Sequence, residues 1–152
     1  MTTMRFMIIR KADADTEAGK APAAGLIEAM MRYNEELVKA GVMVGGDGLH
    51  PSARGAKIKF SGGKPTVVDG PFAEAKELIA GYTMIEVASR EEALEWVKRW
   101  PAEDGDGNVE LELRQVITPE SYAEVFGEAF TPEHQEWEER LRAETAAQHG
   151  ER

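Results

Sequence analysis

Two strand–helix–strand units follow one another in the first 117 residues, and their order constrains the fold more than any other feature of this sequence. In the first unit, residues 4–10 are rich in β-forming side chains, and residues 25–40 carry apolar side chains at helical spacing. In the second unit, residues 81–87 predict a strand. The helix after it is capped by Ser89, with Glu92 reaching back, and ended by Pro101.

This order predicts an α+β, ferredoxin-like βαββαβ domain with an inserted hairpin. The hairpin is indicated by residues 56–60 and 65–69, two short strand-like runs around a Gly-Gly centre. The last strand is indicated by residues 109–114, which alternate cleanly between apolar and charged side chains. Because helices would cover only one side of such a sheet, we expect its other face to pair with a second copy in a homodimer.

Three segments between these elements carry more specific expectations. The predicted helix has an apolar stripe, which Asn34 interrupts, formed by Leu26, Ile27, Met30, Met31, Leu37 and Val38. Residues 11–24 and 104–108 are small, polar and glycine-containing, and they predict a loop and a turn. Three glycines, Gly45, Gly46 and Gly48, should end a short strand by forcing turns, or allow another group to approach the backbone.

The last 35 residues predict a helical extension, so we divide the chain into a domain of residues 1–117 and an acidic tail of residues 118–152. Thr118 and Thr131 each precede proline and glutamate, the pattern of a helix start. Trp137 and Leu141 lie four residues apart and would form one small docking spot on the second helix. The tail is therefore a candidate for a contact with a partner or between copies.

Composition excludes several classes of function. The chain has no cysteine, which removes disulfides, thiolate nucleophiles and Cys-based zinc sites. Its formal net charge of -10 argues against nucleic acid as a partner. It shows neither a secretory signal nor an apolar run long enough to cross a membrane, so we expect a cytoplasmic protein. It also lacks a dinucleotide fingerprint and a phosphate loop, and we expect no cofactor.

One segment carries a recognisable motif. It runs Asp69-Gly70-Pro71-Phe72, continues through Glu74 and Lys76-Glu77, and reaches Gly81-Tyr82 at the start of a strand. This pattern resembles the signature of the DGPF proteins, a branch of the YCII-related family. The stretch Gly48-Leu49-His50-Pro51-Ser52 and the strand at residues 110–114 are also similar to that family, so the resemblance covers about residues 4–116.

The resemblance implies a dimeric α/β-barrel, in which two ferredoxin-like sheets pack face to face. Its superfamily includes small enzymes such as muconolactone isomerase, and YCII-like proteins are suspected of using a His–Asp pair. DGPF proteins are often encoded beside extracytoplasmic-function sigma factors, which implies a regulatory context. A shared fold by itself does not assign any of these activities.

Asp69 and His50 are the catalytic candidates. Asp69 ends a strand before Gly70-Pro71, where its carboxylate would either accept backbone hydrogen bonds in the turn or act as a general base. His50 is the one histidine inside the domain, and it would either lie exposed or pair with Asp69. The candidates for ligand binding come from the motif and the strand after it: Gly70, Pro71, Phe72, Glu74, Lys76 and Tyr82.

A metal site is not expected, because no spacing of Asp47, His50, Asp69 and Glu74 matches a metal motif. Two hypotheses on function remain. The first is a small dimeric protein that binds a small-molecule ligand, or a regulatory protein such as an extracytoplasmic-function sigma factor. The alternative is a cofactor-free isomerase, lyase or hydrolase that uses Asp69, with or without His50, as acid or base. Whether the protein is an enzyme stays open at this point.

Overall fold

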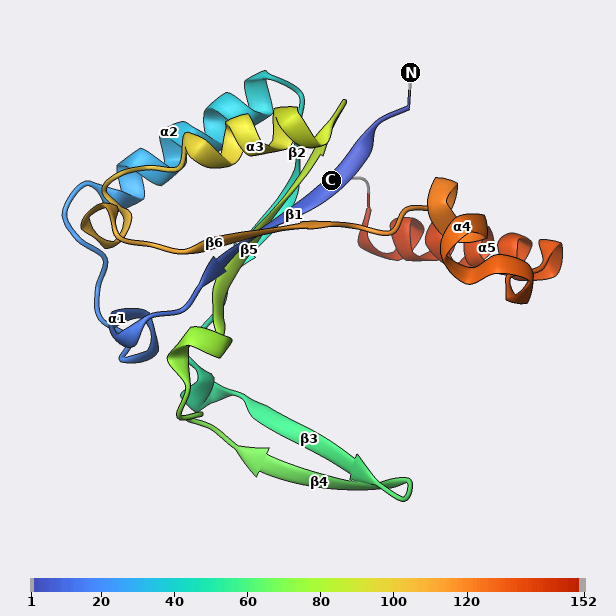
Figure 1. Cartoon of the computed structure of the whole chain (residues 1–152), viewed down its shortest axis with the longest axis horizontal. Coiled ribbons are helices and arrows are strands. Elements are labelled where there is room, and N and C mark those ends of the chain that lie inside the picture. The colour runs from blue at the N-terminus through green and yellow to red at the C-terminus, as the bar shows by residue number, and fades with distance from the viewer. Residues whose placement is uncertain (1, 151–152) are drawn as a thin grey trace. The chain divides into compact units, whose positions relative to one another are not determined.

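The computed structural model describes residues 2–150, and contacts divide the chain into an N-terminal unit, Met1–Val116, and a C-terminal unit, Ile117–Arg152. The N-terminal unit is built on a four-stranded antiparallel sheet with the strand order β2-β5-β1-β6 (Figure 1). Its strands are β1 (Met4–Lys11), β2 (Met43–Gly48), β5 (Ile79–Val87) and β6 (Leu111–Gln115). The predicted α+β class, with an antiparallel sheet and a C-terminal helix, is confirmed.

Two helices, α2 (Leu26–Lys39) and α3 (Arg90–Lys98), pack on one face of this sheet (Figure 1). Alternation along the strands supplies the core between them, because every second side chain of β1 and β5 points toward the helices. Tyr33 joins the two helices: its hydroxyl donates to the Trp96 carbonyl oxygen at 2.7 Å. The core residues are Phe6, Ile8, Tyr33, Leu37, Val42, Ile85, Val87 and Ala93.

The predicted apolar stripe of α2 is only partly correct. Ile27, Met31 and Val38 are 63%, 67% and 61% exposed. Leu37 is buried against the sheet as predicted, and Tyr33, which was not part of the predicted stripe, is buried with it. The sequence pattern did not include Tyr33, because an amphipathic tyrosine can sit on either side of a helix.

Other local predictions hold with small changes. Ser89 caps α3 by accepting from the Glu92 backbone N–H at 3.1 Å, while the Glu92 carboxylate accepts from the N–H of Ala88 rather than of Ser89. The loop predicted at residues 11–24 contains a short helix, α1 (Ala14–Glu17), capped by Asp13. Short 3₁₀ turns occur at Ser52–Arg54, Ala75–Glu77, Asp104–Gly107, Pro119–Ser121 and Gly127–Ala129.

The predicted hairpin is present as a separate two-stranded sheet, β3 (Ala56–Ser61) and β4 (Lys64–Asp69) (Figure 1). Its two-residue turn is formed by Gly62 and Gly63, whose φ angles of 56° and 79° favour glycine.

The glycines after residue 44 do not force turns, which corrects that expectation. Gly45, Gly46 and Gly48 all lie inside β2. A Cβ atom at Gly46 would lie 2.5 Å from the Tyr82 carbonyl oxygen, so the group that approaches this backbone is the neighbouring strand β5. Strand pairing therefore overrides the weak strand preference of glycine.

The C-terminal unit contains α4 (Tyr122–Phe126) and α5 (Pro132–His149). The start predicted at Thr131 is confirmed, since its side chain caps α5, whereas Thr118 precedes a 3₁₀ turn that begins at Pro119 and its side chain makes no capping bond. Between residues 2 and 150, no helix combines the length and apolarity needed to cross a membrane.

Candidate functional site

A cavity of about 650 Å³ lies between α2 and one end of the sheet. Its apolar lining includes Leu26, Met30 and Met43. A second cavity of about 640 Å³ adjoins it and shares Arg10 and Asp104, among other residues. Pockets for small organic ligands usually measure about 300–1,000 Å³ and combine apolar walls with a few polar groups.

Glycines leave room for this cavity. The strand register aligns Arg10 with Gly81, and Gly81 with Gly48, in one row across β1, β5 and β2. Residues in one row share a face of the sheet, so Arg10 is the one side chain in these three positions. The next row places Thr83 beside Gly46. This end of the sheet therefore lacks the bulky side chains that fill the core elsewhere.

Arg10 and Asp104 form a buried ion pair in the wall of the cavity, with side chains only 10% and 9% exposed. The Arg10 Nε donates to Asp104 Oδ2 at 3.0 Å, and Nη2 donates to Oδ1 at 2.7 Å. Trp100 adds a third bond from its indole Nε1 to Asp104 Oδ2 at 2.9 Å. Such a two-point contact fixes the plane of the guanidinium group.

The remaining Arg10 donor, Nη1, reaches the Lys11 carbonyl oxygen at 2.8 Å and Asp13 Oδ2 at 3.0 Å. Asp13 also caps α1, because its other carboxylate oxygen accepts from the Thr16 backbone N–H. Two carboxylates surround one guanidinium group, so this cluster carries net negative charge.

These contacts shift the pKa values of all three charged groups in the cluster. Burial acts to raise the pKa of Asp104, but the hydrogen bonds from Arg10 and Trp100 outweigh it and leave the pKa below its ordinary value of 3.8. The hydrogen bond from the Thr16 backbone, with that from Arg10, lowers the pKa of Asp13. The bond to Asp104 raises the pKa of Arg10. The cluster is therefore fully ionised near neutral pH.

Asn34 projects from α2 and also lines the cavity. Its Oδ1 is buried and has no hydrogen-bond partner among residues 2–150. Buried polar atoms in folded proteins are nearly always hydrogen-bonded, so this acceptor lacks the partner that such an atom normally has.

Of the ligand-binding residues predicted from the sequence, Tyr82 lines this cavity and Lys76 lines a smaller one of about 250 Å³. The Tyr82 hydroxyl donates to Asp47 Oδ2 at 3.1 Å, and this bond raises the pKa of Tyr82. Strand alternation turns the Tyr82 side chain to the face opposite Thr83. The aromatic ring therefore belongs to the open face of the sheet, not to the helix side.

The two catalytic candidates are not joined by a hydrogen bond. Asp69 is exposed at the end of β4, and within the described residues its carboxylate makes no hydrogen bond, including the one predicted with its own turn. His50 is exposed as well, and both of its ring nitrogens lie within 3.2 Å of the Arg54 Nη1 atom. In residues 2–150, no group of three or more His, Asp or Glu side chains is placed to hold a metal ion.

The rest of the motif packs on the 3₁₀ turn after His50. The Ser52 Oγ accepts from the Phe72 backbone N–H at 3.0 Å and donates to the Glu17 carboxylate. Gly70 donates its N–H to the Gly55 carbonyl oxygen at 2.9 Å. Lys57 Nζ lies 4.5 Å from the centre of the Phe72 ring. Gly70 and Phe72 thus hold the loop in place, whereas Pro71 and Glu74 are exposed.

Sequence reasoning missed four residues that line this cavity or the one adjoining it: Arg10, Asp13, Asn34 and Asp104. Two signals were present. Arg10 stands in the same strand alternation as Phe6 and Ile8, where a charged side chain requires a buried partner. Asn34 interrupts the apolar stripe of α2. For Asp104 there was no comparable signal, since an aspartate before glycine is ordinary turn chemistry.

Comparison with known proteins assigns the family. The model of the YCII-related domain matches residues 4–118, and the chain belongs to the YCII-related family. An uncharacterized protein of Rhizobium meliloti is 42% identical over 50 residues, which are 33% of this chain and 40% of that protein. The chain thus spans less than half the length of that relative.

Proposed function

We propose that this YCII-related protein, which we assign to the DGPF type, binds a small organic ligand in the cavity between α2 and the sheet. The observation that carries the proposal is the convergence of polar groups in a cavity of ligand size. Arg10 and Asp104 supply a rigid, buried wall, and Asn34 Oδ1 supplies an acceptor without a partner.

The charges of the lining restrict the ligand. The single guanidinium group of Arg10 is already hydrogen-bonded to the carboxylates of Asp104 and Asp13. An anion would meet uncompensated negative charge, so the ligand is neutral or cationic. It carries at least one N–H or O–H donor for Asn34 and an apolar part for Leu26 and Met30.

The proposed ligand site is compatible with a ferredoxin-like domain that pairs into a dimeric α/β-barrel. The strand order β2-β5-β1-β6, with α2 and α3 on one face, supports that arrangement. The other face presents Met7, Ile9 and Met84, all only partly buried in the single chain. A second copy on that face would bury these side chains and leave the cavities on the helix side open.

The acid–base alternative with Asp69 and His50 stays a prediction, as does a sigma factor as partner. Substitution of Asp69 by asparagine separates the enzyme hypothesis from the binding proposal. Loss of ligand binding in this variant would favour the DGPF loop as the site, whereas unchanged binding supports the cavity.

Filling the cavity should abolish binding. Gly48 lines the cavity, and a Cβ atom added to it meets nothing within 4 Å, so the side chain of Gly48→Leu starts in open space at the cavity wall. We expect the full-length variant to remain folded and the Kd of any neutral or cationic hit from a thermal-shift screen to rise at least about tenfold, equal to about 1.4 kcal/mol. Isothermal titration calorimetry measures the change.

Thr66→Leu is the matched control, because it adds the same side chain to an exposed position of β4. We expect this control to bind as the wild type does. Equal affinity of the wild type and Gly48→Leu would contradict the proposed site.

A further inference from the structure

The β3–β4 hairpin has an exposed apolar face. The register pairs Ile58 with Val67 and Phe60 with Pro65, so these four side chains share one face of the ribbon. Ile58, Phe60 and Val67 are 53%, 70% and 63% exposed. A two-stranded hairpin alone is marginally stable in water, and a contact on this face would stabilise it.

The hairpin is also cationic. It carries three lysines, Lys57, Lys59 and Lys64, against one aspartate, Asp69, in a chain whose formal net charge is -10. Lys57 already lies over the Phe72 ring. Lys59 and Lys64 form no ion pair within residues 2–150 and are free to meet acidic groups.

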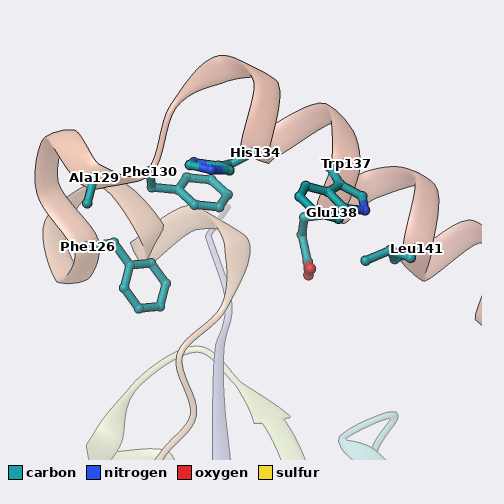
Figure 2. A pocket seen from close by; sticks show the side chains of 7 residues that line it. All are labelled: Phe126, Ala129, Phe130, His134, Trp137, Glu138 and Leu141. Carbon is teal, nitrogen blue, oxygen red and sulfur yellow. The ribbon is translucent and has the colours of Figure 1, made fainter.

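The C-terminal unit offers the complementary surface. A groove of about 510 Å³ is lined by Phe126, Phe130, Trp137 and Leu141, and Figure 2 shows these side chains with Glu138 among them. Trp137 is 54% exposed and Leu141 47%. Residues 117–150 hold eight glutamates against two arginines, so this aromatic groove lies on a strongly acidic unit.

We propose that the β3–β4 hairpin of one copy docks in the aromatic groove of the C-terminal unit of a second copy. Phe60 and Ile58 fill the apolar groove, while Lys59 and Lys64, on the opposite face of the ribbon, add positive charge to the hairpin that approaches the acidic unit. Both surfaces are exposed in the single chain, and opposite charges draw them together. Because each copy carries one hairpin and one groove, two reciprocal contacts close a symmetric dimer.

Mixed cysteine variants test this contact, since the native chain contains no cysteine. Full-length Phe60→Cys protein with an affinity tag is mixed with untagged Leu141→Cys protein and treated with a short bismaleimide linker. We expect a covalent heterodimer of the two variants, identified by its mass after tag capture. Val68→Cys is the matched control, because Val68 is exposed on the opposite face of the same hairpin.

The expected result is a heterodimer that forms several-fold faster with Phe60→Cys than with Val68→Cys and slows when Lys59 and Lys64 are both replaced by glutamate. Equal rates for the two positions, or no heterodimer from either, would overturn the proposal. Linkage confined to a single chain in the Phe60→Cys, Leu141→Cys double variant would overturn it as well. Circular dichroism of each variant checks that the exposed substitutions leave the fold intact.

Discussion

Replacing Asp104 with alanine lowers the free energy of unfolding by about 3 kcal/mol, the largest single effect that we expect in this protein. The substitution leaves the guanidinium group of Arg10 buried without its two-point partner and removes the acceptor of the Trp100 indole N–H. The value lies at the low end of the range for broken buried ion pairs, because Asp13 still accepts from Arg10. Urea denaturation followed by circular dichroism measures the loss.

Glu28→Ala is the control, because it breaks the exposed pair with Arg32 on α2 and should change stability by no more than about 0.5 kcal/mol.

The pH dependence of the free energy of unfolding provides a second check. The folded pKa of Asp104 is depressed, so its contribution is complete above its ordinary value of 3.8 and is lost as the pH falls through the folded pKa. The stabilities of the wild type and Asp104→Ala should therefore start to converge as the pH falls below about 4 and continue to converge as it falls through the folded pKa of Asp104. A variant as stable as Glu28→Ala at neutral pH would contradict the structural role of the pair.

Replacing Gly70 with alanine should have the second-largest effect. An added Cβ atom would lie 1.8 Å from the Ser52 carbonyl oxygen and 2.6 Å from its carbonyl carbon, so the loop must leave the turn on which it packs. We expect a loss of roughly 2 kcal/mol, typical of overpacking. The hydrogen bonds of Gly70 and Phe72 to this turn should break with it.

Hydrogen exchange of the Gly70 and Phe72 amides reports this change directly, together with urea denaturation. Gly45→Ala is the matched control, since a Cβ atom there meets nothing within 4 Å and φ is ordinary for an L-residue. Protected amides and unchanged stability in Gly70→Ala would show that the loop does not depend on this close packing.

Local patterns were sufficient to predict most of the elements. The Gly-Gly turn specified the hairpin, and the alternation in residues 109–114 specified β6, because each depends on neighbours in sequence. The starts of α3 and α5 followed from Ser89 and Thr131, whose side chains cap helices through bonds to the next turn.

The cavity could not be predicted in the same way, because it depends on residues far apart in the chain. Arg10 and Asp104 are 94 positions apart, and the space beside them arises from the alignment of Gly48 with Gly81 across two strands. The side of α2 that faces the sheet is also set by distant residues. Apolar side chains lie on two sides of this helix, and packing against the sheet buries the side that carries Leu37.

The DGPF motif shows a different limit. Its residue types suggested chemistry at Asp69, but the structure shows the contacts of Gly70 and Phe72 with Ser52 and Gly55. A recognisable motif can record packing as well as reaction, and only contacts distinguish the two. Asp69 and His50 stay predictions, because a site on an exposed loop can be completed by a ligand or a second copy.

The most direct test of the central claim is a crystal structure of the full-length protein soaked with small neutral and cationic amines and alcohols. Our account predicts a ligand between α2 and the sheet, with an N–H or O–H group within hydrogen-bonding distance of Asn34 Oδ1 and the Arg10–Asp104 pair intact. A ligand bound instead at Asp69 and His50, with nothing between α2 and the sheet, would contradict it.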